Sequence, residues 1–387
     1  MKICFLTGNI FTIGGVQRVL SVIASELSKY HTIDILCTDD NLVIDRKMYN
    51  LNQNVNIVNP TGLRNKNIIN KVFKGINRIT GMFNNNILYK VLTEIYFPRK
   101  MRKKLTQYLN DNKYDLIIGA EGYYSLLLGL ISKEIDAKTI GWQHSSYNAY
   151  LNNRYRYYWN QDKLFKEYLH NLDKCIVLTE EDSKLYKEKL NINCDVIYNP
   201  LSFQSKIKSK CNDKSIIFVG RLVKQAKGLD LLIKAFSLVN QEKEDWQLKI
   251  VGDGPDRKKL IKYIYKYHLE NNIILLGKSD NVKKHYLESS IFVSSSRWEG
   301  FGLAITEAME CGLPVIAFKN SGPKEIINKN NENGILVPCN DVEKLANTII
   351  ELIENRRKRE YIAQKSIERA KDFSLKIIIQ QWCEFIK

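Results

Sequence analysis

The stretch that decides the fold is residues 294–317, which read SSSRWEGFGLAITEAMECGLPVIA. It begins at the end of an apolar run, Ile291–Ser294, and passes through a glycine-containing loop. A helix-like segment over 302–311 follows, and a second apolar run then spans Pro314–Phe318. Short apolar runs that alternate with helical segments are typical of a parallel sheet covered by helices. The stretch therefore predicts a strand–loop–helix–strand unit.

The same alternation extends in both directions along the chain. Further strands are expected at Lys2–Thr7, Thr32–Cys37, Val55–Val58, Asp115–Gly119, Lys138–Trp142, Asp173–Thr179, Ser215–Gly220, Leu248–Gly252, Ile273–Gly277 and Gly334–Val337. Further helices are expected at 16–30, 228–239, 255–268, 321–328 and 341–353. The pattern pauses at the charged stretch Ser205–Lys214, which indicates a domain boundary. We predict an α/β fold of two Rossmann-like domains in tandem, facing a cleft, over residues 1–203 and 204–371, with a C-terminal helix over 372–387.

Composition excludes several other classes of protein. With 44% hydrophobic and 26% charged residues, the 387-residue chain has the composition of a soluble globular protein. No apolar run approaches the roughly 18 residues that a membrane-spanning helix needs. The start, Met1–Thr7, lacks a small-residue cleavage site, so we interpret it as a buried strand and not a signal peptide. The eight cysteines are scattered without a CxxC pair, which favours reduced thiols in the cytoplasm over disulfides or a zinc site.

Positive charge is concentrated in residues 61–113. The chain carries a formal net charge of +17, and this segment has twelve Lys and Arg against two acidic residues. Apolar residues lie among these cations, at Ile68, Ile69, Val72, Phe73, Ile76, Ile95, Tyr96 and Phe97. Such a mixture suits an anionic membrane surface. A solvated helical face and nucleic acid are the alternatives. Since no recognised nucleic-acid module is present, nucleic acid is not an expected partner.

Several loops that follow predicted strands carry chemistry suited to a sugar and a diphosphate. Gly300 and Gly302 let the backbone approach a ligand, and the N–H groups of Leu303 and Ala304 at the helix start can hold a phosphate. The carboxylates of Glu299 and Glu307 can accept hydrogen bonds from hydroxyl groups.

Two cations, Arg221 and Lys227, follow the strand that ends at Gly220 and suit a diphosphate. Gly14-Gly15 forms a glycine-rich turn into a helix, and His144 comes directly after a strand. Each feature alone has a structural explanation, as a turn glycine, a surface charge or a hydrogen-bonded loop histidine. Their combination at strand–loop–helix junctions favours a binding site.

The motif set resembles glycosyltransferase family 4, whose members are retaining enzymes with the GT-B fold. The motifs that carry the resemblance are E-x7-E at Glu299–Glu307, G-R-L…K-G at 220–228, V-G-D-G-P at 251–255, G-G-x-x-R at 14–18, His144, and N-P at 199–200. The resemblance spans nearly the whole chain and is weakest over 60–113.

By this resemblance, a nucleotide sugar, with UDP favoured as its nucleotide, is held mainly by the second domain, while the first domain binds the acceptor. The implied catalytic residues are Arg221, Lys227, Glu299 and His144. The implied donor-binding residues are Gly14, Gly15, Gly220, Gly277, Lys278, Ser279, Gly300, Phe301, Gly302, Leu303, Ala304 and Glu307. The C-terminal helix would cross back onto the first domain.

The resemblance also implies a reaction and a location. Cations and helix N–H groups stabilise the departing diphosphate, and the acceptor attacks from the same face of the sugar. No Asp-x-Asp metal motif is seen, so neither a divalent metal nor another cofactor is expected. We expect a hexosyltransferase at the inner face of the cell membrane that extends a glycan or lipid-linked saccharide of lipopolysaccharide or capsule type. The alternatives are a GT-B sugar-nucleotide epimerase and a non-catalytic module that binds anionic lipid.

Overall fold

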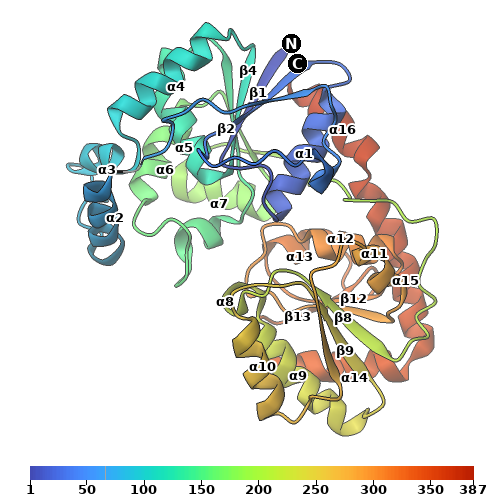
Figure 1. Cartoon of the computed structure of the whole chain (residues 1–387). Coiled ribbons are helices and arrows are strands. Elements are labelled where there is room, and N and C mark those ends of the chain that lie inside the picture. The colour runs from blue at the N-terminus through green and yellow to red at the C-terminus, as the bar shows by residue number, and fades with distance from the viewer. Residues whose placement is uncertain (66) are drawn as a thin grey trace. The chain divides into compact units, whose positions relative to one another are not determined.

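The computed structural model describes residues 1–65 and 67–387. Lys66, one of the cations of the basic segment, lies outside the described residues. The chain divides into two compact units, which Figure 1 shows in colours running from the N- to the C-terminus. Unit 1 comprises residues 1–198 and 378–387, and unit 2 comprises residues 199–377. The expected boundaries at 203/204 and 371/372 lie a few residues from these divisions.

Unit 1 is built on a seven-stranded sheet in the order β3-β2-β1-β4-β5-β6-β7. All its strand pairs are parallel. The strands are β1 (Lys2–Thr7), β2 (Thr32–Cys37), β3 (Val55–Val58), β4 (Leu116–Ala120), β5 (Lys138–Trp142), β6 (Lys174–Val177) and β7 (Asp195–Val196). The helices between them are α1 (Gly15–Leu27), α2 (Ile68–Thr80), α3 (Tyr89–Tyr96), α4 (Arg99–Asp111), α5 (Glu121–Ile131), α6 (Asp162–Tyr168) and α7 (Glu180–Leu190).

The core of unit 1 forms because helices cover both faces of its sheet. All five residues of β4 are buried, as expected for a central parallel strand. Helix α1 buries the apolar stripe that its sequence predicts, but it ends at Leu27 and not at Tyr30. Cys4 and Cys37 are fully buried, and all eight cysteines are free, as expected.

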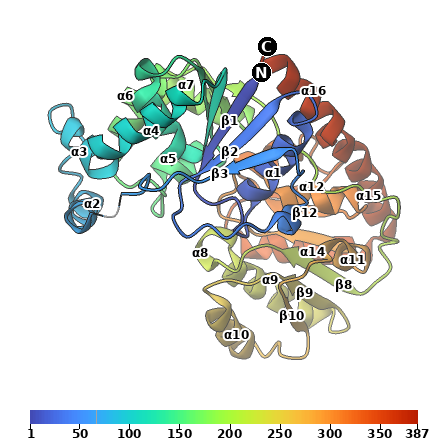
Figure 2. The same cartoon turned by 45° about the horizontal axis from the view of Figure 1, so that its top comes forward.

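The end of the sequence also belongs to unit 1. Helix α16 (Leu375–Phe385) lies beside the sheet of unit 1 in Figure 2. Its Trp382 is fully buried, and its ring centroid lies 4.8 Å from that of Trp142 on β5. The Lys174 ammonium lies 4.2 Å from the Phe385 ring centroid. The last ten residues therefore complete the packing around β5 and β6.

Unit 2 repeats the topology with a six-stranded parallel sheet in the order β10-β9-β8-β11-β12-β13. The strands are β8 (Ser215–Val219), β9 (Gln247–Val251), β10 (Ile273–Gly277), β11 (Ile291–Ser294), β12 (Val315–Phe318) and β13 (Ile335–Val337). The helices are α8 (Lys224–Lys227), α9 (Leu229–Glu242), α10 (Arg257–Lys266), α11 (Val282–Leu287), α12 (Leu303–Glu310), α13 (Ser321–Ile326), α14 (Val342–Glu354) and α15 (Arg356–Ala370).

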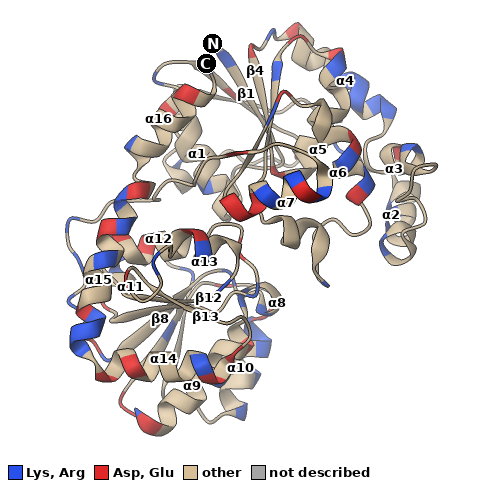
Figure 3. Ribbon diagram, turned by 180° about the vertical axis from the view of Figure 1, so that it is seen from behind, with Lys and Arg blue, Asp and Glu red and all other residues tan. Residues whose placement is uncertain are grey.

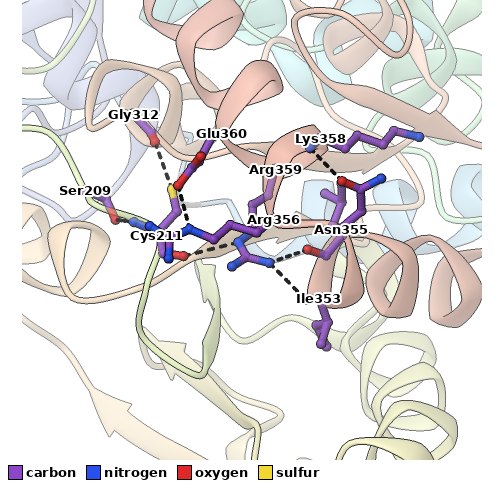
Figure 4. A network of polar contacts seen from close by, with 10 residues as sticks. Ser209, Cys211, Gly312, Ile353, Asn355, Arg356, Lys358, Arg359 and Glu360 are labelled. Atoms are coloured by element: carbon purple, nitrogen blue, oxygen red, sulfur yellow. Dashed lines mark hydrogen bonds and ion pairs between the residues drawn. The ribbon is translucent and has the colours of Figure 1, made fainter.

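Helix α15, which the sequence pattern did not predict, is fixed to unit 2 by the buried side chain of Arg359 (Figure 4). Its guanidinium donates hydrogen bonds to the carbonyl oxygens of Cys211 at 3.2 Å, Leu352 at 2.6 Å and Ile353 at 3.0 Å. Burial lowers the pKa of Arg359. A buried cation needs such partners, and here it joins three segments of unit 2.

The basic segment folds into α2, α3 and α4, and its apolar residues divide into two groups. Ile95 and Phe97 are buried in the core, so the expectation that they belong to an exposed apolar surface is wrong. On α2, only Asn77 is buried. It forms hydrogen bonds to the backbone of Asn160 and Phe83, which fix the helix through polar contacts. In Figures 1 and 2, α2 and α3 stand out from the rest of unit 1.

Candidate active site

The centre of the sheet in unit 2 defines the most favourable position for a ligand. Strands β8 and β11 are neighbours there, while the chain leaves β8 toward β9 and β11 toward β12. In open parallel sheets, ligands bind beyond the carboxyl ends of the two strands that flank such a switch point. The residues that follow β8 include Gly220 and Arg221, and those that follow β11 lead to Glu299. The topology therefore places the predicted donor-binding motifs at one edge, which we call the donor edge.

Backbone hydrogen bonds join three strand ends at the donor edge. The Gly220 N–H donates to the Val251 carbonyl at 3.0 Å, and the Gly252 N–H donates to the Gly277 carbonyl at 2.7 Å. Gly252 has a φ of 135°, and a Cβ there would lie 2.0 Å from the Gly220 carbonyl oxygen. Only glycine fits this close approach. The V-G-D-G-P run therefore holds the G-R-L loop in position.

A second close approach fixes Lys227 beside the loop that follows β11. Gly228 has a φ of 62°, and a Cβ there would lie 2.0 Å from the Ser295 carbonyl oxygen. The Ser295 hydroxyl donates to the Lys227 carbonyl at 2.9 Å. The glycine of the K-G motif is thus required by backbone conformation and by packing.

The structure brings Lys227 and Glu299 into direct contact, although 72 positions separate them. The Lys227 ammonium lies 2.5 Å from Glu299 Oε2, which also accepts a hydrogen bond from the Ser296 hydroxyl at 3.1 Å. The side chains of Lys227 and Glu299 are 26% and 19% exposed. Because the pair is only partly covered, its atoms remain accessible to a ligand.

A bidentate ion pair between Arg297 and Asp230, which was not predicted from the sequence, fixes the segment that carries Glu299. The Arg297 guanidinium donates two hydrogen bonds of 2.9 Å to Asp230 on α9, and one of 3.0 Å to the Lys224 carbonyl. Bidentate pairs of this kind fix orientation as well as distance. Arg297 therefore positions the loop between β11 and α12 against α8 and α9.

Arg221 differs from Lys227 because its side chain is exposed. Within residues 1–65 and 67–387, no hydrogen bond or ion pair reaches its guanidinium. A planar guanidinium with several donors can bind two phosphate oxygens at once. Arg221 is therefore an available cation at the donor edge, whereas Lys227 is paired.

Helix α12 presents its N-terminus after the loop that contains Glu299. Gly302, at the N-cap position, has a φ of 114°, and no side chain among the described residues caps the helix. Leu303 and Ala304 are half-buried, while Gly300 and Phe301 are buried. The Phe301 ring packs at 5.5 Å from the Phe373 ring. The backbone N–H groups at the start of α12 are thus positioned for an anion.

Glu307 lies inside α12 and is only 3% exposed. Its Oε2 accepts a hydrogen bond of 3.0 Å from the hydroxyl of Tyr286 on α11. The sequence analysis did not identify Tyr286, because a tyrosine in a short amphipathic helix carries no distinctive signal. The tyrosine orients the carboxylate of Glu307, one of the donor-binding residues that the family resemblance implies.

The loop after β10 contains the remaining predicted donor-binding residues of unit 2. Gly277 has a φ of 71°, and a Cβ there would meet open space. Lys278 is exposed. The Ser279 hydroxyl accepts from the Asn281 N–H at 3.2 Å and lies 3.1 Å from a ring nitrogen of His285. These residues lie at the carboxyl end of β10 and just after it, and therefore belong to the donor edge.

The predicted residues of unit 1 follow β1 and β5. Gly14 and Gly15 form the start of α1, where no described side chain provides a cap. Gly14 has an extended backbone with φ of −175°, so its conformation does not require glycine, and its N–H donates to the Tyr49 hydroxyl at 3.0 Å. Gly15 is exposed.

His144 lies just beyond β5, with its ring centroid 4.1 Å from that of Trp142. Among the residues that the structure describes, its Nε2 is buried without a hydrogen-bond partner. Burial lowers the pKa of His144 to about 3, so the imidazole is neutral at physiological pH. An unpaired buried nitrogen is unusual and is consistent with a ligand-binding role.

A cavity of about 520 Å³ opens in unit 1 at the amino ends of the strands, opposite the carboxyl ends that carry Gly14, Gly15 and His144. Its lining includes Met1, Tyr114, Asp115 and Lys138, near the amino ends of β1, β4 and β5. None of the predicted site residues lines it. Because ligands of parallel sheets bind at carboxyl ends, we do not assign the site to this cavity.

Comparison with known proteins defines the class of the chain. The family described as Glycosyltransferase Family 4 matches residues 13–204, and the family described as Glycosyl transferases group 1 matches residues 202–369. Together with the arrangement of the donor edge, these matches show that the chain belongs to the glycosyltransferases of the family 4 type.

Relatives and solved structures agree with this assignment. An uncharacterized glycosyltransferase of Haemophilus influenzae is 28% identical over 386 residues, 98% of each chain. The poly(glycerol-phosphate) alpha-glucosyltransferase of Bacillus subtilis is 27% identical over 239 residues, which cover 60% of this chain and 35% of that protein. Staphylococcus aureus TarM, solved with UDP, has a TM-score of 0.77 at 18% identity over the full length of both chains. Sucrose-phosphate synthase from Thermosynechococcus elongatus has a TM-score of 0.78 at 19% identity, covering 100% of this chain and 98% of that one. The expected GT-B fold is confirmed.

Proposed function

We propose that this glycosyltransferase moves a hexose, with retention of anomeric configuration, from a nucleoside diphosphate sugar to a glycan or lipid-linked saccharide. The observation that carries the proposal is the arrangement at the donor edge. There, the Lys227–Glu299 pair, the unpaired Arg221 and the start of α12 follow neighbouring strands. Positive groups for a diphosphate and a carboxylate for sugar hydroxyls are thus held by one edge of unit 2.

In the proposed reaction, the diphosphate gains negative charge as the bond to the anomeric carbon breaks. Arg221 binds the phosphates through two donors, Lys227 acts as a point charge, and the N–H groups at the start of α12 add partial positive charge. Glu299 accepts hydrogen bonds from the donor sugar, and Glu307 accepts them from the ribose. The acceptor oxygen attacks the same face of the sugar, and its proton passes to the departing phosphate.

We further propose that the donor is a UDP-sugar and that no divalent metal takes part. TarM and Anabaena HepE, a structural neighbour with a TM-score of 0.75 at 20% identity, were both solved in complex with UDP. Arg221, Lys227 and the helix N-terminus supply the positive charge that a metal provides in other transferases. The direct measurement is the transfer rate in EDTA and in added Mg²⁺. A rate that falls at least tenfold in EDTA and returns with Mg²⁺ contradicts metal independence.

The proposed setting is bacterial surface polysaccharide synthesis, in the cytoplasm at the membrane surface. One relative is named a poly(ribitol-phosphate) alpha-N-acetylglucosaminyltransferase and another an amylovoran biosynthesis glycosyltransferase. Seven further relatives are matched over only 23–62% of their own length. Among the described residues, no helix has the length and apolarity required to cross a membrane.

The face of α2 supports docking on an anionic membrane. Ile68, Ile69, Val72 and Ile79 are 58–85% exposed, although apolar residues at helical spacing normally face a core. Cations accompany them on the same helix and on α4, which Figure 3 shows in blue. We propose that these apolar side chains enter the headgroup region while the cations bind lipid phosphates.

Donor binding is tested by thermal unfolding in the presence of UDP and of UDP-sugars. A ligand at 100 times its dissociation constant raises the free energy of unfolding by about 2.7 kcal/mol. If no nucleotide or nucleotide sugar changes the melting temperature, the proposed function is wrong. Incubating a labelled nucleotide sugar without acceptor separates a transferase from an epimerase, because an epimerase converts the donor into its isomer.

Membrane docking is tested with vesicles containing phosphatidylglycerol. Ile69→Glu should weaken vesicle binding at least tenfold, because it places a negative charge among exposed apolar residues near the lipid surface. Ile207→Glu is the matched control, since Ile207 is 69% exposed in unit 2 and Ile69 is 63% exposed. The proposal is contradicted if both variants bind these vesicles equally. It is also contradicted if the wild type binds neutral vesicles in high salt as strongly as it binds vesicles containing phosphatidylglycerol.

A further inference from the structure

The sheet of unit 1 has its own switch point, and Glu121, which is not one of the predicted site residues, lies there. Strands β1 and β4 are neighbours, and the chain leaves β1 toward β2 and β4 toward β5. Glu121 is the first residue after β4. By the same rule that placed the donor edge, the carboxyl ends of β1 and β4 flank a binding position in unit 1.

The backbone of Glu121 is in a conformation that glutamate rarely adopts. Its φ is 72°, in the left-handed region that favours glycine or asparagine. Neighbouring contacts hold this turn, because the Gly122 N–H lies 3.3 Å from the Tyr150 hydroxyl and the Tyr123 N–H lies 2.8 Å from the Tyr158 hydroxyl. Backbone strain of this kind is concentrated at functional sites.

The fold gives the Glu121 carboxylate no structural partner. In the part of the chain that the structure describes, no hydrogen bond or ion pair reaches it. Burial raises the pKa of Glu121 to about 7. Burial also raises the pKa values of Tyr150, Tyr158 and Tyr124, and the charge of Glu121 adds to this effect. A strained, partly buried acid that bonds to nothing in its own chain does not contribute to stability.

The Tyr150 hydroxyl connects the residue after Glu121 to His144. The Tyr150 hydroxyl lies 3.3 Å from the Gly122 N–H and 3.4 Å from the His144 N–H, so it joins the residues that follow β4 and β5. The His144 Nε2 is likewise buried without a described partner. One edge of the sheet thus holds an unpaired carboxylate, a neutral imidazole and several aromatic rings.

This chemistry suits a saccharide better than an anion. A carboxylate and a neutral imidazole accept hydrogen bonds from hydroxyl groups, and aromatic side chains commonly line the binding sites of small molecules. The carboxylate repels phosphate, so the donor's diphosphate is disfavoured here. We infer that Glu121 binds hydroxyl groups of the acceptor saccharide beside His144, which deepens the proposed function and rests on it.

The test measures binding of three sugars by saturation-transfer NMR in the presence of UDP. The probes are the methyl glycosides of glucose, galactose and N-acetylglucosamine, which carry the hydroxyl patterns of common acceptors. Glu121→Gln and Glu121→Gly should each lower the affinity for the most tightly bound of the three sugars about tenfold or more, because each removes a charged hydrogen-bond acceptor. Glu134→Gln is the control, since Glu134 is an exposed acid of the same unit.

The melting temperature distinguishes a binding role of Glu121 from a structural one. If Glu121 stabilised the fold, its replacement would lower the melting temperature. Glu121→Gly relieves the left-handed strain, so its melting temperature should equal or exceed that of the wild type while saccharide binding is lost. Undiminished saccharide binding by Glu121→Gly, or no saturation transfer from the wild type to any of the three sugars, overturns the inference. Failure of UDP to bind the wild type instead refutes the proposed function, so the two failures are distinguishable.

Discussion

Replacing Arg221 by alanine should weaken donor binding without affecting stability. Its guanidinium is exposed and bonds to none of the described residues, so its loss leaves no protein group unpaired. The free energy of unfolding of the ligand-free protein should change by no more than about 0.5 kcal/mol. A hydrogen-bonded charge on a diphosphate contributes about 1.5–3 kcal/mol. The dissociation constant of UDP should therefore rise about 10- to 150-fold.

The corresponding change at Lys227 should behave differently. Lys227→Ala removes the partner of Glu299 and leaves that carboxylate, 19% exposed, with only the Ser296 hydroxyl. We expect a loss of about 1–3 kcal/mol of unfolding free energy together with weaker UDP binding. Both alanine variants should therefore bind UDP more weakly, but only Lys227→Ala should destabilise the protein, because only Lys227 forms an ion pair with Glu299.

The assay combines isothermal titration with UDP and urea unfolding of the ligand-free protein. Arg357→Ala is the matched control, because Arg357 is an exposed arginine at the start of α15 and does not belong to the loops of the donor edge. If Arg221→Ala binds UDP within twofold of the wild type, Arg221 does not contact the diphosphate, and the assignment of the donor edge is wrong.

Three further predictions concern residues that hold the site or the units in place. Gly228→Ala should cost at least about 2 kcal/mol in urea unfolding, since a Cβ would meet the Ser295 carbonyl at 2.0 Å and the residue has a positive φ; a change below 0.5 kcal/mol would contradict this. Burial lowers the pKa of His144 to about 3 against an ordinary 6.5, so its contribution to stability is complete above pH 6.5 and is lost as the pH falls toward 3. The wild type should thus lose about 2 kcal/mol more than His144→Gln between pH 6.5 and 5 in denaturant titrations, and parallel losses would show that His144 is exposed. Arg359→Met should lower the free energy of unfolding by about 3 kcal/mol, because it removes the donor of three carbonyl groups, and an unchanged urea midpoint would refute the role assigned to that network.

The strands were the most predictable part of the fold. The predicted bounds of β1, β2, β3, β5, β10 and β11 coincide with the observed ones. For β1 and β11 the reason is that buried parallel strands are continuous apolar runs, whereas β3 and β10 are partly exposed edge strands. Helix α15 was missed because its apolar stripe is interrupted by Arg359, a charged residue that is buried. A prediction from hydrophobic periodicity counts a charged residue as facing solvent, so the buried face of α15 is not recognised.

The candidate site was predictable where glycines mark close approaches. Gly228, Gly252 and Gly302 each occupy a positive-φ position that the motifs indicated. Glu121 could not be found in this way, since a glutamate gives no sign of a left-handed backbone. The pairing of Lys227 with Glu299 also depends on the β8–β11 adjacency, which local sequence does not reveal.

The apolar residues of the basic segment show a further limit. Ile69 and Ile95 lie in similar sequence surroundings, yet one is exposed and the other is buried. Asn77 and Asn160 attach α2 through polar contacts, and Ile76 packs against the core, while Ile68, Ile69, Val72 and Ile79 stay exposed. A polar attachment of that kind is formed by residues 83 positions apart, beyond the range of any helical pattern.

The placement of residues 378–387 in unit 1 has a consequence for biosynthesis. Unit 1 is discontinuous, since residues 199–377 are translated between its two pieces. While the ribosome synthesises unit 2, the Trp142 face of β5 lacks Trp382, its aromatic neighbour. Unit 2, being one uninterrupted segment, can complete its own folding first. Nascent chains that stall before residue 382 therefore leave the Trp142 indole, beside His144, without this aromatic neighbour.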